Sequence, residues 1–170
     1  MPDYKEIPDS TKWRLASRCA SMIPALYDRV FRAEVGERYD VLEQEIWMEL
    51  ARMVPDIARD LVLPTHNAHD LAMTMQTVTV ILFGPEYRGE VLDVADDRSV
   101  ILVKRCPFLE HGCHAGIPGE QFFSRCMTLT LTAVPLLNKN YSARYVRTIC
   151  TRDRQCEIKI QPNPPETKEK

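Results

Sequence analysis

The sequence predicts an α+β fold, with N-terminal helices packed on an antiparallel sheet that is made of two β-hairpins with an intervening helix. Three observations support this prediction. In the first half of the chain, apolar residues recur every three or four positions, which is the period of a helix. After residue 86 the pattern changes to short runs that alternate between apolar and polar residues, separated by polar turns. One more helical pattern separates the two hairpins, and this element order is typical of α+β proteins.

The first helix is predicted over residues 10–36. Asp9 or Ser10 can cap its N-terminus, and Gly36 is typical of a helix end. Pro24 lies in the middle and predicts a kink or a restart, because proline lacks the backbone N–H that the helix interior needs. The apolar positions that share one face of this helix are Trp13, Ala16, Ala20, Ile23, Tyr27 and Val30.

The second helix has the most regular apolar pattern in the chain, a continuous stripe over about six turns. Pro55 can bend this helix, and Pro64 ends it. We expect the middle of the stripe to be buried in the core or in a dimer interface, because so regular a stripe has no other use in a soluble chain. The stripe consists of Tyr39, Leu42, Ile46, Leu50, Met53, Ile57 and Leu61, and its predicted buried members are Leu42, Ile46, Leu50, Met53 and Ile57.

A third helix is predicted between a polar break at residues 65–69 and Gly84. The β-branched run at residues 77–81 also fits a strand. Gly84 followed by Pro85 is typical of a helix C-terminus and favours the helix. The helical spacing is carried by Leu71, Met75, Val78 and Leu82.

Two β-hairpins are predicted in the second half of the chain. The first joins residues 87–94 to residues 99–105, and the second joins residues 143–150 to residues 156–161. Residues 106–119 are rich in glycine, histidine and proline, and we expect them to form a loop. The helix between the hairpins carries Phe122, Cys126, Leu129, Ala133 and Leu137 at helical spacing.

One domain over residues 1–161 accommodates these elements, since 170 residues is the usual size of a single domain. Residues 1–84 form its mainly helical part, and residues 85–161 form its cysteine-rich part of hairpin, helix and hairpin. Residues 162–170 are charged and rich in proline, and we expect them to be a disordered tail.

The composition argues against nucleic acid and membranes as partners. The chain has 22 basic and 24 acidic residues, a net charge of -2, and the two signs are interspersed. Such a chain has no basic surface for nucleic acid or for an anionic membrane. Its start lacks the pattern of a secretory signal, and its longest apolar run, residues 78–83, is too short to cross a bilayer. We therefore expect a cytoplasmic protein whose six cysteines are reduced.

Cysteines and histidines gather in the second half of the chain. Five of the six cysteines and two of the four histidines fall between residues 106 and 156. Thiolate and imidazole are the ligands that zinc or a thiophilic iron centre requires, so the sequence indicates a Zn or iron site here. The spacing alone is not diagnostic, because the chain has no paired C-x-x-C motif. The candidate metal ligands are Cys106, Cys113, His114, Cys126 and Cys156.

Two other interpretations of these cysteines are open. Cysteine often packs in protein cores as a small apolar residue, which suits Cys126 on the inward face of its helix. A catalytic thiol is the second interpretation, with Cys113 as a nucleophile activated by His111 or His114. The catalytic candidates are therefore Cys113, His111 and His114.

The C-terminal half also resembles a known pattern. It has a strand that ends in Cys106-Pro107, a helix that carries Cys126, and a closing hairpin whose second strand begins at Cys156. Over residues 85–161 this pattern is similar to the L-2-amino-thiazoline-4-carboxylic acid hydrolase-like family. It also resembles the bacteriochlorophyll 4-vinyl-reductase-type small-molecule-binding domains, which belong to a larger group with haem nitric-oxide-binding domains and trafficking-particle subunits.

The resemblance implies helices packed on one antiparallel sheet, often in a dimer, with a pocket for a hydrophobic or metal-bound ligand. It implies Cys106, Cys126 and Cys156 as ligands. The pair Cys113-His114 adds to the family pattern and can complete a four-ligand site. The last turn departs from the pattern, with Arg152-Asp153-Arg154 in place of a glycine-aspartate pair.

Three functions follow as hypotheses. The first is a cytoplasmic, sensor-like domain that binds a small molecule or a metal at the Cys/His site. The second is a hydrolase of a small cyclic amide or thiazoline, which uses a metal-bound water or a Cys–His pair. The third is a non-catalytic scaffold whose helices pair with another subunit. The expected partners are a small-molecule ligand and, in a homodimer, a second copy of the chain.

Overall fold

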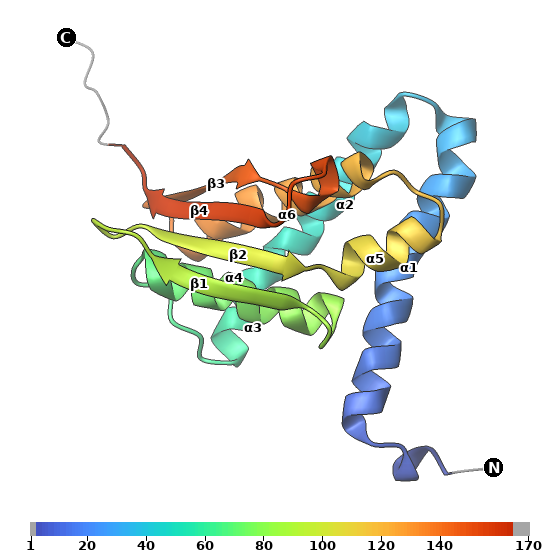
Figure 1. Ribbon diagram of the computed structural model, residues 1–170, viewed down its shortest axis with the longest axis horizontal. Coiled ribbons are helices and arrows are strands. Elements are labelled where there is room, and N and C mark those ends of the chain that lie inside the picture. Colours follow the sequence, from blue (N-terminus) through green and yellow to red (C-terminus); the bar gives the residue numbers. More distant parts are fainter. Residues whose placement is uncertain (1–2, 165–170) are drawn as a thin grey trace.

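The computed structural model describes residues 3–164 of the chain. Its centre is a four-stranded antiparallel sheet with helices against one face (Figure 1). The strand order β1-β2-β4-β3 joins the two hairpins through the pairing of β2 with β4. The predicted α+β fold, with two hairpins and an intervening helix, is confirmed. The strands are β1 (Arg88–Asp93), β2 (Ser99–Arg105), β3 (Tyr141–Arg147) and β4 (Cys156–Pro162).

Most of the helices form a layer behind the sheet, and α1 lies beside it. In Figure 1, α4 and α6 lie behind the sheet, whereas α1 runs past one end of it and contacts α4 and α5. α2 packs on α6. None of the described helices is both long and apolar enough to cross a membrane. The helices are α1 (Asp9–Val35), α2 (Arg38–Arg52), α3 (Val54–Asp60), α4 (Ala68–Phe83), α5 (Pro107–His114) and α6 (Gly119–Leu137), with short 3-10 turns η1 (Tyr4–Glu6) and η2 (Ile149–Thr151).

Alternation along the strands decides which face of the sheet meets the helices. Ile101 of β2 pairs with Ile158 of β4, and both side chains are buried in the core. On the opposite face, Lys104 forms an ion pair with Glu90 at an N–O separation of 2.8 Å. Successive residues of a strand point to opposite sides, so an antiparallel sheet can bury one face and expose the other to water.

The stripe over residues 39–61 does not form one helix. α2 ends at Arg52 and α3 begins at Val54, with Pro55 in the first turn of α3. Proline is tolerated in a first helical turn, where its missing N–H has no partner to lose, but it disrupts a helix interior. The apolar spacing continues across the break, so periodicity alone does not locate it. α1, in contrast, runs through Pro24 as one helix.

The apolar stripe of α1 does not face the core. The side chains of Ile23, Tyr27 and Val30 are exposed, although their spacing is that of a buried face. The face of α1 that packs inward carries small and polar residues instead. The small residues allow the neighbouring helices to approach closely, and Asp28 at the end of this face forms an ion pair. That buried face consists of Ser17, Ser21, Ala25 and Asp28.

In α2, too, the predicted apolar stripe is not the buried face. The buried face of α2 consists of Tyr39, Glu43, Trp47 and Ala51. Most of the stripe that the sequence predicts to be buried faces outward, and the side chain of Ile46 is 66% exposed. The prediction that the whole stripe is buried in the core of one chain is therefore wrong. Burial of the stripe in a dimer interface stays a prediction. Leu42, Ile46 and Met53 are exposed, and Leu50 and Ile57 are partly buried against the core.

Residues 106–119, predicted as a loop, contain the helix α5. Pro107 opens this helix, and Phe108 is fully buried. Gly112 is present for close packing rather than for a turn, because a Cβ atom there would lie 1.7 Å from Cζ of Phe122. Composition cannot distinguish a packing glycine from a loop glycine, and the helix was missed for that reason.

We expect Gly112→Ala to lower the free energy of unfolding by about 1–3 kcal/mol, the usual range for an overpacked core. Phe122 is fully buried, so its ring cannot move away without displacing its neighbours. Urea unfolding checks this, with the exposed neighbour Cys113→Ala as the control. The double variant Gly112→Ala/Phe122→Leu should lose less stability than the two single variants together, because the smaller leucine makes room for the added Cβ. A Gly112→Ala protein as stable as its parent would contradict the close packing of α5 on α6.

The end of β4 extends into the predicted tail. Pro162 is the last residue of β4, and the backbone N–H of Asn163 donates to the carbonyl oxygen of Asn140 at 2.8 Å. The Asn163 side chain donates to the carbonyl oxygen of Lys139 at 2.9 Å. A disordered tail is therefore the wrong prediction for residues 162 and 163. Residues 165–170 lie outside the described part of the chain.

Candidate functional site

A large apolar groove lies between α1 and α2. Its volume is about 550 Å³, which is within the range of ligand sites in proteins. α4 and α5 contribute residues at its base. We call it the α1–α2 groove, and it is lined by Ala20, Ile23, Pro24, Tyr27, Phe31, Val35, Tyr39, Leu42, Glu43, Ile46, Trp47, Leu50, Leu82, Phe83 and Phe108.

The outward-facing stripes of α1 and α2 form the walls of this groove. The chain reverses between the two helices at Gly36, whose φ of 66° lies in the region that favours glycine. The reversal places Tyr27 of α1 and Ile46 of α2 on the same cavity. The stripes that the sequence marks as buried are thus the ones that line the groove.

Glu43 is a buried carboxylate in the lining of an otherwise apolar groove. The hydroxyl of Tyr39 donates to its Oε1 atom at 3.2 Å. Nε of Arg125 lies 2.9 Å from the same oxygen, in an ion pair without the alignment of a hydrogen bond. Burial raises the pKa of Glu43, and the positive charge of Arg125 acts in the opposite direction.

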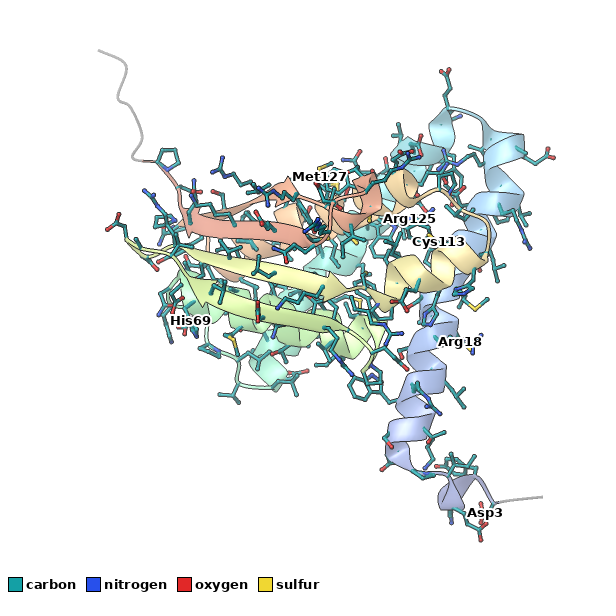
Figure 2. All side chains as sticks on the ribbon, viewed as in Figure 1. Asp3, Arg18, His69, Cys113, Arg125 and Met127 are labelled. Carbon is teal, nitrogen blue, oxygen red and sulfur yellow. The ribbon has the colours of Figure 1, made fainter. Side chains whose placement is uncertain are left out.

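Arg125, labelled in Figure 2, joins three helices behind Glu43. Its side chain is 1% exposed and forms ion pairs with Glu43 of α2 and Asp28 of α1. Asp28 also accepts hydrogen bonds from Nε of Arg32 at 2.7 Å and from Nη2 of Arg32 at 2.9 Å. A buried carboxylate needs such partners, because its loss of hydration is costly. This network therefore holds α1 and α2 on α6, and with them the walls of the groove.

A second, smaller apolar cavity lies between the sheet and helices α4 and α6. Its volume is about 50 Å³. An apolar cavity that holds benzene measures about 150 Å³, so this one is too small for an aromatic ligand in the present conformation. We call it the thiol pocket, and it is lined by Met75, Thr79, Phe83, Tyr87, Ile101, Val103, Cys106, Leu109, Cys126, Leu129, Thr130, Tyr145, Thr148, Ile149, Cys150, Cys156 and Ile158.

Aromatic side chains separate the two cavities. Phe83 contributes to the lining of both. Its ring stacks on Phe108 with centroids 4.7 Å apart, and Trp47 lies 5.4 Å from Phe108 between ring centroids. Aromatic contacts of this kind stabilise a core by about 0.5–1.5 kcal/mol beyond the burial of their area. They form a packed wall between groove and pocket.

The thiol pocket brings together three of the predicted metal ligands. Cys106, Cys126 and Cys156 line it, and Cys150 joins them. Burial raises the pKa of Cys106 to about 12 and that of Cys150 to about 11. Burial also raises the pKa values of Cys126 and Cys156. At neutral pH these groups are uncharged thiols, which pack like small apolar side chains.

The other two predicted ligands lie elsewhere. Cys113 and His114 are exposed on α5, and Nδ1 of His114 lies 2.6 Å from the carbonyl oxygen of Glu110. Within residues 3–164, no group of three or more His, Cys, Asp or Glu side chains is placed to hold a metal ion. The arrangement therefore lends no support to a Zn or iron site, which stays a prediction.

The predicted Cys–His pair has no hydrogen bond that joins it. Among the described residues, neither His111 nor His114 contacts the thiol of Cys113 in this way. Nδ1 of His111 is buried and has no hydrogen-bond partner among residues 3–164, and burial lowers the pKa of this imidazole. A nucleophilic cysteine needs a base within hydrogen-bond reach. The hydrolase hypothesis thus gains nothing from this geometry.

The charged residues of the buried network behind the groove were not among the candidates from sequence. Asp28, Glu43 and Arg125 look there like the solvent-facing charges of amphipathic helices. One signal was present: Asp28 continues a stripe of small residues that begins at Ser17 and recurs every three or four positions. A charge at the end of such a stripe is a candidate for a buried ion pair.

Comparisons with known proteins identify the fold. No protein-family model matches the chain, and no curated protein matches its sequence. The structure is similar to that of a trafficking protein particle complex subunit 3 from Naegleria fowleri covalently bound to palmitic acid, with a TM-score of 0.61 over 88% of this chain and 96% of that chain, at 11% identity. It is also similar to the phenol-responsive sensory domain of the transcription activator PoxR with phenol, with a TM-score of 0.53 over 84% of this chain and 74% of that chain, at 13% identity.

At such low identities a structural likeness shows the fold alone. It confirms the architecture that the family resemblance implies, which a trafficking-particle subunit also has. Membership of the hydrolase-like and vinyl-reductase-type families stays a prediction. The chain therefore has the α+β fold that is shared by a trafficking-particle subunit and a phenol-responsive sensory domain.

Proposed function

We propose that this protein is a binding domain for an apolar small molecule, which it holds in the α1–α2 groove. The observation that carries the proposal is the groove itself: about 550 Å³ between two helices whose apolar stripes face into it. Ligand sites are typically concave and mostly apolar, with a few placed polar groups. Here Glu43 and Tyr39 supply those polar groups.

Two proteins with the same fold support this class of ligand. One is covalently bound to palmitic acid, and the other is responsive to phenol. Both molecules are largely apolar, and they differ in size and headgroup. The fold thus accommodates apolar ligands, while the residues of each site decide which ones.

The groove is a better site than the thiol pocket in this conformation. The pocket measures about 50 Å³ and is lined by buried and half-buried side chains, and the Phe83–Phe108 stack closes it toward the groove. The groove is open, and residues such as Ile46 and Tyr27 keep apolar surface exposed to water. A ligand that covers this surface gains about 25 cal/mol for each Å² of apolar area.

We expect Ile46→Arg to weaken the binding of a neutral, polarity-sensitive phenylnaphthylamine dye at least tenfold. Ile46 is exposed on α2, so the change leaves the core intact, and an arginine there can pair with Glu43 and fill the groove. Dye fluorescence measures the binding. The matched control is Leu92→Arg, which alters a half-exposed apolar residue on the strand β1 and should leave the affinity unchanged.

A second copy of the chain is the other candidate occupant of the groove, in agreement with the predicted homodimer. The oligomeric state of the same variants separates the two. If the parent protein is a dimer that excludes the dye, and Ile46→Arg converts it to a monomer, the groove is an interface and the ligand proposal is wrong. Equal dye affinity in parent and Ile46→Arg would also overturn it.

A further inference from the structure

We propose that the α1–α2 groove selects apolar molecules that carry a hydrogen-bond donor, such as a long-chain alcohol, and discriminates against long-chain carboxylates. Glu43 is the residue that makes this selection. The inference rests on the proposed function, because it concerns the headgroup of a ligand in the same groove.

Glu43 lies at the boundary between the buried charge network and the groove. Its side chain is nearly buried, with 8% of the residue exposed, yet it contributes to the lining of the groove. Among the described residues that line the groove, it alone has a charged side chain. An apolar molecule in the groove therefore meets one strong polar group.

The two carboxylate oxygens of Glu43 differ in their hydrogen bonds. Its Oε1 atom accepts from Tyr39 and lies beside Arg125. Within the described part of the chain, no side chain donates to its Oε2 atom. A carboxylate oxygen in an apolar site is strongly stabilised by a hydrogen-bond donor. A ligand hydroxyl or ammonium group can therefore donate the hydrogen bond to Oε2 that the protein does not supply.

The positive charge that balances Glu43 lies outside the groove. Arg125 is buried behind Glu43, does not line the groove, and is already paired with Asp28 and Glu43. A ligand carboxylate in the groove would thus face the negative charge of Glu43 and not the guanidinium. Like charges at short range in an apolar site repel strongly. The groove should therefore disfavour a fatty acid relative to the alcohol of equal chain length.

Three ligands of equal chain length test this: a long-chain alcohol, its methyl ether and the corresponding carboxylic acid. Their affinities are measured by displacement of the phenylnaphthylamine dye at neutral pH. The alcohol should bind at least tenfold more tightly than the ether, because hydrogen bonds to charged groups are strong and the ether has no donor. The acid should bind more weakly than the alcohol.

Variants at the floor of the groove assign the effect to Glu43. Glu43→Leu removes the acceptor and should abolish the preference of alcohol over ether. Glu43→Gln keeps an acceptor oxygen without the charge, so the preference for the alcohol should persist while the penalty on the acid falls. Tyr39→Phe leaves the carboxylate in place and should retain both preferences. If Glu43→Leu does not fold, Glu43→Gln and the ligand series on the parent protein decide the question.

The outcomes separate this inference from the proposed function. If the parent protein does not bind the dye, the groove is not a ligand site and both fall. If the dye binds but alcohol and ether displace it equally, or the acid displaces it best, the groove binds ligands without selection by Glu43 and only this inference is overturned. Unchanged preferences in Glu43→Leu would overturn it as well.

Discussion

Replacement of Arg125 by methionine is expected to lower the free energy of unfolding by about 3–5 kcal/mol, the usual loss when one partner of a buried ion pair is removed. Arg125 and Asp28 have side-chain exposures of 1% and 2%, and Glu43 is nearly buried as well. Methionine fills a similar volume but leaves both carboxylates without their shared counter-charge. Urea denaturation followed by circular dichroism measures the loss.

The matched control is Arg52→Met at the end of α2. Arg52 pairs with Glu49, and their side chains are 59% and 67% exposed. An exposed pair contributes about 0–1 kcal/mol, so this variant should be nearly as stable as its parent. If Arg125→Met loses no more stability than Arg52→Met, the buried network does not hold α1 and α2 on α6.

The cysteines should divide sharply in their reaction with iodoacetamide. At pH 8 we expect Cys19 and Cys113, which are exposed, to react about a hundredfold faster or more than the cysteines of the thiol pocket. The thiolate is the reactive form, and a thiol with a pKa of about 11, such as Cys150, is about one part in a thousand ionised at that pH. The partial or full burial of the pocket cysteines also slows access of the reagent to the sulfur. Because the thiolate fraction of a pocket cysteine grows with pH, its rate of reaction with iodoacetamide should rise as pH rises.

Peptide mapping by mass spectrometry over time gives the rate at each cysteine, and the unfolded protein provides the control in which all should react alike. Equal rates at Cys126 and Cys113 would contradict the burial of the pocket. A chelator adds a test of the predicted metal site. If chelation exposes the pocket cysteines together in protein purified without oxygen, a metal protects them and the Zn or iron prediction gains its first support.

The fold was predictable because its signals are local. Alternation and polar turns mark each hairpin, and helical spacing marks α4 and α6. The closing of two hairpins into one sheet follows from their shared apolar faces. β2 and β4 meet there through pairs such as Ile101 with Ile158.

The orientation of α1 and α2 was not predictable from periodicity. A helical period shows which residues share a face, but it does not show which face turns inward. For α1 and α2, ion pairs with a residue far away in the sequence decide which face packs inward. Arg125 lies 97 residues from Asp28 in the chain, and their ion pair exists only in the folded protein. For α2, the ion pair between Arg125 and Glu43 draws the face that carries Glu43 inward and leaves Ile46 on the groove.

The candidate site was predictable in part. The sequence indicates that cysteines from a strand end, a helix and a hairpin gather, and Cys106, Cys126 and Cys156 do line one pocket. It does not indicate how deeply they are buried, and burial keeps them neutral instead of available as thiolates. The groove escaped prediction because its walls look like a core stripe in the sequence.

A photoreactive long-chain alcohol tests most directly whether the α1–α2 groove is a ligand site. An alcohol with a diazirine at the far end of its chain is bound, irradiated, and located by peptide mapping, with an excess of unmodified alcohol as competitor. Saturable labelling should fall on the α1 and α2 segments that carry Tyr27 and Ile46, and it should be lost in Ile46→Arg. Labelling that the competitor does not reduce, or that falls on the β1 segment with Leu92, would contradict the assignment of the groove as the binding site.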